Sequence, residues 1–525
     1  MKNVPHMTSD RYYRFEGPLM DSQLSKAARP QKDKTFRSDY TVRDGCLEIT
    51  NGPNLFNRPL FAPECKSLLT AGDRPAFIFW ESNHYQKFEE LNWGIPNTLG
   101  YSYIGFACGG RSKWLHELEH CHTVFHPGWV EYKLSDEAFS GVTAALNVVP
   151  HRSGAFYLEF TFAAEPGAEI PEIIWTHGCL SYEGKNCFMS SYDPQSRLIP
   201  WRQPELAAND SVTFTGSAAV LRDDTDGANW VCAAAWPQAV ECASVDANCQ
   251  IEVAPAEIFS CPSTGSPMAA LRVRAQQAGH GRAQACLALN WGRGTSPQPA
   301  LTADPALWRS AVAEGVAHFK ERCDRIAIHT PDEELNTMFR FAAVSADGMW
   351  HPPAVNHCAY SWGGLTTIFR IFYGLTCCGD HDRVHSALDF HCAFDSDGRL
   401  CNLAGSDSER PQASQYESYG STADMLWHHY LWTGDLALLR EWAPVLDALL
   451  AYEERALRDA DGLYIDHLGF WASDSFEYEF GCAVGSTMVW RMYTVRGKIA
   501  EALGEDVGVD DVALGLTHLA AAEQQ

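Results

Sequence analysis

Long apolar runs are missing from this sequence. The first residues, MKNVPHMTSDRYYRFEG, contain no apolar segment of the kind that a signal peptide requires. Nowhere does the chain approach the roughly 20 consecutive apolar residues of a membrane-spanning helix. We therefore expect a cytoplasmic protein that does not enter a membrane, and an extracytoplasmic location only if a segment before Met1 has been lost.

Positive charge is scarce as well. The chain has 40 Lys and Arg residues against 66 Asp and Glu residues, which gives a formal net charge of −26. A protein that binds nucleic acid needs a basic surface to neutralise phosphates, and an anionic membrane attracts proteins in the same way. The charge therefore disfavours both partners and favours a neutral small molecule or a carbohydrate.

A compact disulfide framework is also absent. The 18 cysteines are scattered over 525 residues, and Cys377 and Cys378 are adjacent. Adjacent cysteines have poor geometry for an ordinary disulfide. We expect most cysteines to be buried thiols in a reducing compartment.

The first half of the chain has the pattern of a β-rich domain. Residues 1–295 contain short runs of β-branched and aromatic residues, such as GAFYLEFTFAAE and SVTFTGSAAVLRDD. Gly, Pro, Asn and Asp interrupt these runs at short intervals, and no long amphipathic helix separates them. The pattern predicts an antiparallel β-sandwich-like domain over 1–295.

The second half is expected to be helical. Residues 296–329 form a linker with a helix at 306–326, which Asp304 and Pro305 begin. The next helix starts at Thr330, with Pro331 in its first turn. Further helices are predicted at about 364–373, 382–392, 421–433, 436–458, 484–503 and 509–522. Long loops at 350–361, 393–419 and 460–480 alternate with short turns, so the long loops should gather at one end of the helical hairpins.

Three stretches of the helical half resemble a known superfamily. LWTGDLALLREWAPVLDALLAYEERALRDADGLY (431–464) resembles an outer hairpin of the six-hairpin (α/α)6 glycosidases, in which a Thr-Gly-Asp turn ends one helix and caps the next. The segments 346–388 and 470–506 are similar to the first hairpin and to a Trp-x-Ser-Asp segment of an uncharacterised bacterial family in that superfamily. The FNRPLF and GDRPAF stretches of the β half are similar to its N-terminal region.

The resemblance implies a fold and an activity. The fold is a multidomain β + α architecture, with the antiparallel β-sandwich-like domain followed by a partial (α/α)6 toroid at 330–525. A complete toroid needs twelve helices, and the residues after 330 suffice for roughly half of them, so we expect a chain truncated within the barrel. The implied activity is hydrolysis of a poly- or oligosaccharide by two carboxyl groups, inverting by analogy, with no cofactor and no metal.

Acidic residues in the long loops are the candidate catalysts. Asp474 lies among aromatic residues just before an inner helix, where burial beside Trp471 would raise its pKa, as a general acid requires. Glu417 precedes another inner helix, in an area where the family has an acidic residue. Glu477 is a weaker candidate for substrate contact, and Asp424 is expected to lie within the helix and to orient other groups. Each of these acids also has a simpler interpretation as a helix cap or a solvated side chain.

The first hairpin supplies candidate substrate-binding residues. Trp350 and Trp362 have flat faces that suit sugar rings, while His357 and Arg370 can donate hydrogen bonds to hydroxyl groups. Arg370 is also suited to a carboxylate on the substrate, such as that of a uronic acid. A packed loop without any ligand explains these residues about equally well.

A competing motif lies in the β half. His116, Glu117 and His120 match the HExxH pattern of zinc metallopeptidases. The alternation of His120 and His122 with Glu119 and Cys121 favours a strand instead, with the three histidines on one face. Pro127 and Gly128 then break the run, and no further histidine extends the motif. We expect a plain strand, with a structural metal or a zinc peptidase as minor alternatives.

Two other classes of function remain beside the glycosidase. A non-catalytic carbohydrate-binding protein, or an inactive remnant of an enzyme, would follow if half of the barrel were missing. The zinc metallopeptidase is the third class. The residues do not decide the sugar, the linkage, the stereochemistry or the oligomeric state.

Overall fold

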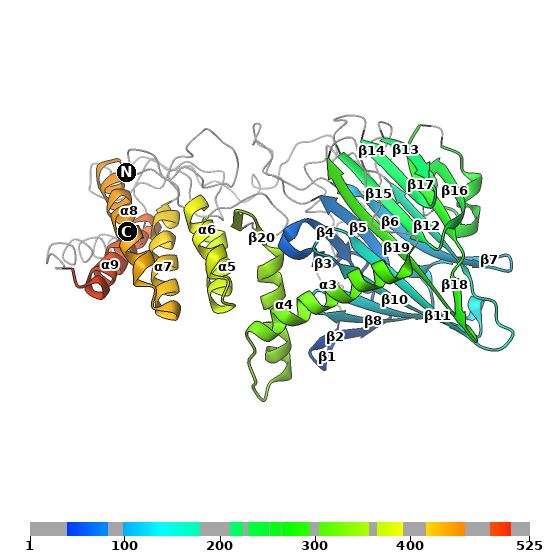
Figure 1. Cartoon of the computed structure of the whole chain (residues 1–525), viewed down its shortest axis with the longest axis horizontal. Coiled ribbons are helices and arrows are strands. Elements are labelled where there is room, and N and C mark those ends of the chain that lie inside the picture. Colours follow the sequence, from blue (N-terminus) through cyan, green and yellow to red (C-terminus); the bar gives the residue numbers. More distant parts are fainter. Residues whose placement is uncertain are drawn as a thin grey trace, which may run out of the picture.

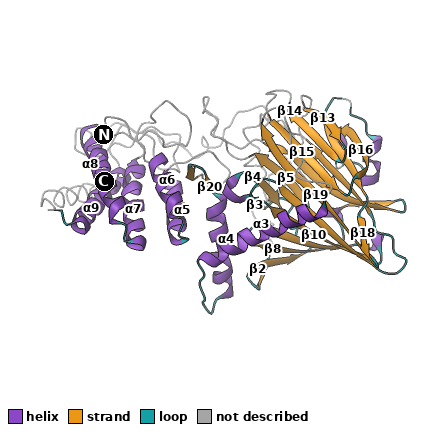
Figure 2. Cartoon of the chain, viewed as in Figure 1, coloured by secondary structure: helices purple, strands orange, loops and turns teal. Residues whose placement is uncertain are grey.

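The computed structural model describes ten stretches of the chain: 39–81, 98–178, 210–223, 229–250, 252–263, 265–293, 304–355, 365–391, 416–456 and 483–505. A strand-rich part is followed by a row of helices that extends away from it, so the molecule is elongated (Figures 1 and 2). Among the described helices, none is both long and apolar enough to cross a membrane.

The strand-rich part contains two large antiparallel sheets. The larger sheet has the order β1-β2-β8-β9-β10-β11-β19-β15-β14-β13, with β18 also paired to β19. Its strands are β1 (Thr41–Arg43), β2 (Cys46–Thr50), β8 (His120–His126), β9 (Trp129–Ser135), β10 (Val142–Pro150), β11 (Phe156–Ala164), β13 (Asp210–Thr215), β14 (Ala218–Asp223), β15 (Asn229–Trp236), β18 (Gln276–Gly279) and β19 (Arg282–Arg293).

The smaller sheet has the order β16-β17-β12-β6-β5-β4-β3, with β7 also paired to β6. Its strands are β3 (Arg58–Phe61), β4 (Ser67–Ala71), β5 (Ala76–Glu81), β6 (Thr98–Cys108), β7 (Arg111–Trp114), β12 (Glu172–Gly178), β16 (Ala239–Asp246) and β17 (Pro267–Val273). A two-stranded ribbon, β20 (Trp350–His351) and β21 (Ala354–Val355), lies among the helices. The sequence prediction of an antiparallel β domain is therefore confirmed.

The main core lies between the two sheets. Alternate residues along a strand point to opposite faces, so Phe156 and Leu158 of β11 enter this core while Tyr157 points to the other side. Phe77 and Phe79 of β5 meet them from the smaller sheet, and the Phe79 and Phe156 rings lie edge to face at 5.8 Å. Burial of these aromatic and aliphatic side chains is the main source of stability of the domain.

A buried histidine in the smaller sheet makes the β domain sensitive to acid. His177 of β12 is 1% exposed. Its Nε2–H donates to the Leu99 carbonyl oxygen at 2.8 Å, so its Nδ1 accepts from the Ser102 hydroxyl at 2.7 Å. Burial lowers the pKa of His177 to about 4, although the bond to Leu99 acts in the opposite direction. The folded protein therefore holds this imidazole neutral.

Stability is expected to fall as the pH drops from about 6.5 to about 4, because the unfolded chain then binds a proton that folded His177 does not. A pKa shift of this size corresponds to a change of about 3 kcal/mol in the free energy of unfolding. His177→Gln should flatten this part of the pH dependence in urea unfolding, whereas the exposed His280→Gln should leave it as in the wild type. An unchanged slope in His177→Gln would assign the acid sensitivity to other groups.

The outer face of the larger sheet is covered by α3 (Pro305–Arg325). Trp308 is 1% exposed and packs with Tyr157, Trp230 and Trp236. Gly315 lets the helix approach β10, because a Cβ there would lie 2.5 Å from the Pro150 carbonyl oxygen. The helix predicted at 306–326 is thus confirmed, and Asp304 caps it by accepting from Ala306 N at 2.9 Å.

The remaining helices of the described residues include two hairpins, each joined by a short turn. They are α4 (Glu333–Gly348), α5 (Leu365–Cys377), α6 (His381–His391), α7 (Tyr416–Thr433), α8 (Leu436–Ala456) and α9 (Ala483–Leu503). The prediction that Thr330 begins α4 is wrong by two residues: Asp332 is the cap, and it accepts from Leu335 N at 3.0 Å. The helix predicted at 509–522 lies outside the described residues.

The hairpins are arranged in two layers. Helix α7 packs between α5 and α9, while α6 packs against α5, and α8 packs against α7 and α9. Short turns join α5 to α6 and α7 to α8, and in Figure 1 these turns lie at the lower end of the row. The long connections 349–364, 392–415 and 457–482 therefore join the helices at the other end, where α5, α7 and α9 begin. The division into domains at 1–295, 296–329 and 330–525 stays a prediction.

The cysteines of the described residues form no disulfides with one another. All those whose side chains the structure describes are free thiols, including the neighbours Cys377 and Cys378. Burial raises the pKa of both thiols, which makes them less reactive at neutral pH.

Candidate functional site

The candidate site lies along one side of α7, between α5 and α9. Asp424 of α7 forms an ion pair with Arg491 of α9, in which Nε and Nη2 both lie 2.6 Å from Oδ1. Tyr373 of α5 lies nearby. Burial raises its pKa most, and the negative charge of Asp424 raises it further. Side chains of three neighbouring helices, α5, α7 and α9, therefore meet in this layer.

Aromatic rings continue the same side of α7. The Tyr373 and His428 rings are stacked with centroids 3.9 Å apart, and Trp432 Nε1–H donates to His428 Nε2 at 3.2 Å. Burial lowers the pKa of His428, so its ring is neutral at pH 7. Lys498 Nζ lies 6.0 Å from the Trp427 ring. These flat rings and charged groups together form a surface of the kind that contacts sugar rings and hydroxyl groups.

Asp424 has the position that the sequence predicts for an orienting residue. It lies within α7, and Arg491 already occupies one of its oxygens. A carboxylate held in this way is a poor candidate for direct proton transfer. It can fix the place of Arg491 and of the neighbouring Tyr373.

The structure places the other predicted residues differently. Arg370 is exposed on α5. Trp350 of β20 is 6% exposed and packs in the core of the helical part, with the Arg383 guanidinium 5.5 Å from its ring. The expectation that Trp350 stacks on a sugar is therefore not supported, because the apolar faces are used in packing.

Glu417 is the second residue of α7, at the end where α5, α7 and α9 begin. Its side chain is not among those that the structure describes. His357, Trp362, Trp471, Asp474 and Glu477 lie outside the described residues. Their predicted roles stay predictions.

A buried acid that the sequence analysis misses lies near the same end. Glu453 of α8 is 0% exposed, and neither of its carboxyl oxygens has a hydrogen-bond partner among the residues that the structure describes. Burial, with the charge of Glu454 as a smaller contribution, raises the pKa of Glu453 well above its usual range. The carboxyl group therefore holds its proton more tightly than an exposed glutamate does. In the sequence, the Glu453-Glu454 pair is indistinguishable from the solvated side of an amphipathic helix.

The HExxH segment is a short turn followed by a strand. Leu115–Glu117 is a short 3-10 turn, and only His120 and His122 lie on β8. Burial lowers the pKa of His116 to about 4, and its ring packs edge to face on Tyr103 at 5.6 Å. Glu117 accepts from Trp114 N at 3.3 Å, so it is a local cap. The helix that a zinc peptidase requires is absent here. The predicted strand is confirmed for His120 and His122, but not for His116, which lies on the preceding turn.

Within the described part of the chain, one group of side chains has the spacing needed to hold a metal ion. His385, His429 and Asp435 meet beside the short turn between α7 and α8. This group lies at the opposite end of α7 from Glu417. The sequence analysis does not single it out, although His381 and His385 have the same four-residue spacing as the HExxH histidines.

No protein-family model matches the chain, and no curated protein matches it either. Solved structures that are similar include a family GH92 inverting mannosidase from Bacteroides thetaiotaomicron, with a TM-score of 0.42 and 11% identity over 88% of this chain and 61% of that one. A family GH92 α-mannosidase from the same organism has a TM-score of 0.38 in complex with mannoimidazole and 0.39 without it, at 11% identity. These matches cover 89% of this chain and 61% or 63% of the mannosidase chain. The chain therefore spans about three fifths of the length of these structures.

Proposed function

We propose that this chain is a glycoside hydrolase, or the larger part of one, that acts on a poly- or oligosaccharide. The observation that carries the proposal is the arrangement of α5, α7 and α9 in one layer, with all three beginning at the end where the long connections join them. Residues from several distant segments can meet there to surround a substrate. In this proposal, α5, α7 and α9 would be neighbouring inner helices of an (α/α)6 toroid.

The proposed chemistry uses one carboxyl group as acid and one as base. Asp474, in the connection that leads to α9, would protonate the leaving oxygen. Glu417, at the start of α7, would activate the attacking water. Asp424 and Arg491 would keep the adjoining surface in place, and the substrate would contact Trp471, Glu477, His357, Trp362 and Arg370. This mechanism needs no metal and no cofactor.

A non-catalytic carbohydrate-binding protein is the second candidate. Leu431 and Trp432 at the end of α7 are 63% and 58% exposed, which is high for large apolar side chains. Tyr373 of α5 stacks on His428, which also contacts Trp432, and Trp427 lies against Tyr430. Exposed aromatic faces of this kind bind sugars without any catalytic group.

A hydrolysis screen separates the two candidates. The full chain is incubated with a panel of oligosaccharides and aryl glycosides, α-mannosides among them, and reducing ends and released aglycone are measured. Cleavage of at least one glycan supports the hydrolase. Binding by calorimetry without any cleavage would replace it with the binding protein, and the absence of both would remove carbohydrate as the ligand.

A further inference from the structure

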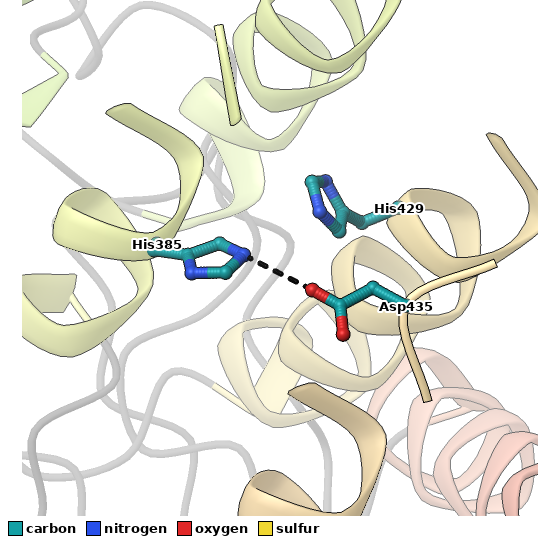
Figure 3. Close-up of side chains that lie close together, drawn as sticks. All are labelled: His385, His429 and Asp435. Atoms are coloured by element: carbon teal, nitrogen blue, oxygen red, sulfur yellow. Dashed lines mark ion pairs between the residues drawn. The ribbon is translucent and has the colours of Figure 1, made fainter. Parts of the chain in front are cut away.

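Three side chains from separate segments converge where the α7–α8 turn meets α6. His385 comes from α6, His429 from the last turn of α7 and Asp435 from the turn itself, and Figure 3 shows the three side chains pointing toward one another. One nitrogen or oxygen from each lies within 4.8 Å of the other two. His385 Nε2 lies 3.6 Å from Asp435 Oδ2.

Contacts outside the cluster leave one ligand atom of each residue directed inward. Asp435 accepts from Leu438 N at 3.0 Å through Oδ1, which caps α8 and leaves Oδ2 toward His385. His429 is 1% exposed, and its Nδ1 shares a 3.2 Å hydrogen bond with the Thr376 hydroxyl. A partner on one ring nitrogen fixes the orientation of the other, which is how proteins prepare histidines for metals.

His385 Nε2 is the atom of the cluster whose hydrogen-bonding capacity is not satisfied. It is buried and has no hydrogen-bond partner among the described residues. The 3.6 Å to Asp435 is too long for a hydrogen bond. It is close to the roughly 3.4 Å that separates two ligand atoms around a tetrahedral zinc ion with bonds of 2.0–2.2 Å. An ion between the two residues would satisfy both.

We propose that His385, His429 and Asp435 bind a zinc ion. Two imidazole nitrogens and one carboxylate oxygen form a donor set that suits zinc, whereas calcium takes six to eight oxygens. A water molecule or His381 would complete the tetrahedron. His381 lies four residues before His385 on the same side of α6, and its ring centroid is 5.2 Å from that of His429.

The position of the ligands gives the ion a structural role. It would connect the α5–α6 hairpin to the α7–α8 hairpin, beside the short turns. His429 lies thirteen residues after the start of α7, which places it roughly 20 Å along the helix from the end that carries Glu417. The zinc site is therefore separate from the proposed catalytic residue Glu417, whereas His428 and Trp432 of the aromatic surface lie next to it in the chain.

Metal analysis of the full chain tests the proposal. The protein is purified without a polyhistidine tag, stripped with a chelator, dialysed against zinc and measured by mass spectrometry of metals. We expect one zinc per chain and a higher Tm in zinc than in chelator. Asp435→Asn should lose most of the zinc while keeping the helix cap, because Asn caps as well as Asp. His385→Ala should also lose it, and His120→Ala in the β domain should bind zinc as the wild type does.

Cobalt substitution gives a readout that does not depend on variants. Tetrahedral cobalt with nitrogen and oxygen ligands should produce strong visible absorption in the wild type, and zinc should displace it. The proposal is overturned if the wild type binds no more zinc than Asp435→Asn, if both variants retain the metal, or if His120→Ala loses it. Absence of the cobalt absorption would overturn it as well.

Discussion

Replacing Asp380 with Asn is expected to lower the free energy of unfolding of the helical part by about 3–5 kcal/mol, the usual loss when one partner of a buried ion pair is removed. Asp380 immediately precedes α6 and accepts hydrogen bonds from Arg322 Nη1, at 2.9 Å, and from Arg322 Nη2 and Arg325. Both arginines belong to α3. The Arg322 side chain is 1% exposed, so its charge has little contact with water.

A second carboxylate completes this buried cluster. Asp347 of α4 is 1% exposed and pairs with His318 and Arg383, each at 2.7 Å. Burial opposes its ionisation, but the hydrogen bond from His318 and the charges of Arg322 and Arg383 outweigh burial and lower the pKa of Asp347 to about 2. The cluster joins the helix that covers the β domain to the first hairpins. Its loss should therefore loosen the connection between the two halves.

A matched control distinguishes the loss of a buried ion pair from the loss of an exposed one. Glu321 pairs with the same Arg325 at 2.5 Å, but on the exposed side of α3. Glu321→Gln should cost less than about 0.5 kcal/mol, because exposed pairs contribute little. Urea unfolding of both variants measures the difference. Equal losses in the two variants would contradict the view that Asp380 acts by neutralising a buried arginine.

Replacing Asp474 with Asn is expected to reduce glycan hydrolysis by about 10²–10⁴-fold, the contribution of a general acid. Asn matches Asp in shape but cannot give up a proton to the leaving oxygen. The loss should be much smaller for aryl glycosides with acidic leaving groups, because these leave without protonation. Rates on natural glycans and on dinitrophenyl glycosides of the same sugar provide the measurement.

Glu417→Gln should behave differently if Glu417 is the base. Activation of water is needed for every leaving group, so the loss should be similar on both kinds of substrate. Glu117→Ala, in the β domain, is the control and should leave hydrolysis unchanged. Near-normal turnover of Asp474→Asn would remove it from the catalytic pair, and a large loss in Glu117→Ala would revive a role for the HExxH segment.

Local signals in the sequence predict the elements well. The Thr-Gly-Asp turn is a clear case: Gly434 has φ of 69°, and Asp435 caps α8. Asp304 and Pro305 likewise begin α3 as predicted. Alternation in GAFYLEFTFAAE gives β11, whose residues divide between the inner core and the outer face. These features depend on a few consecutive residues, so the sequence contains them directly.

The sites depend on contacts between residues that are distant in the chain. The spacing of His116 and His120 is the same as that of His381 and His385, yet the first pair lies on a turn and a strand and the second on a helix. Burial of Trp350, Glu453 and Arg322 likewise follows from packing between helices and not from neighbouring residues.

The sequence by itself determined the antiparallel β domain, the linker helix and the alternation of short turns with long connections, and with it the end at which the long connections meet. These features follow from backbone propensity and from the period of apolar side chains, which are both local properties of the chain. Only the tertiary structure decided which polar residues meet. It pairs Asp424 with Arg491, encloses Arg322 between two carboxylates, and brings His385 to His429 and Asp435. These partners are 25 to 67 residues apart in the chain, and their approach is set by how the helices pack, which no local pattern records.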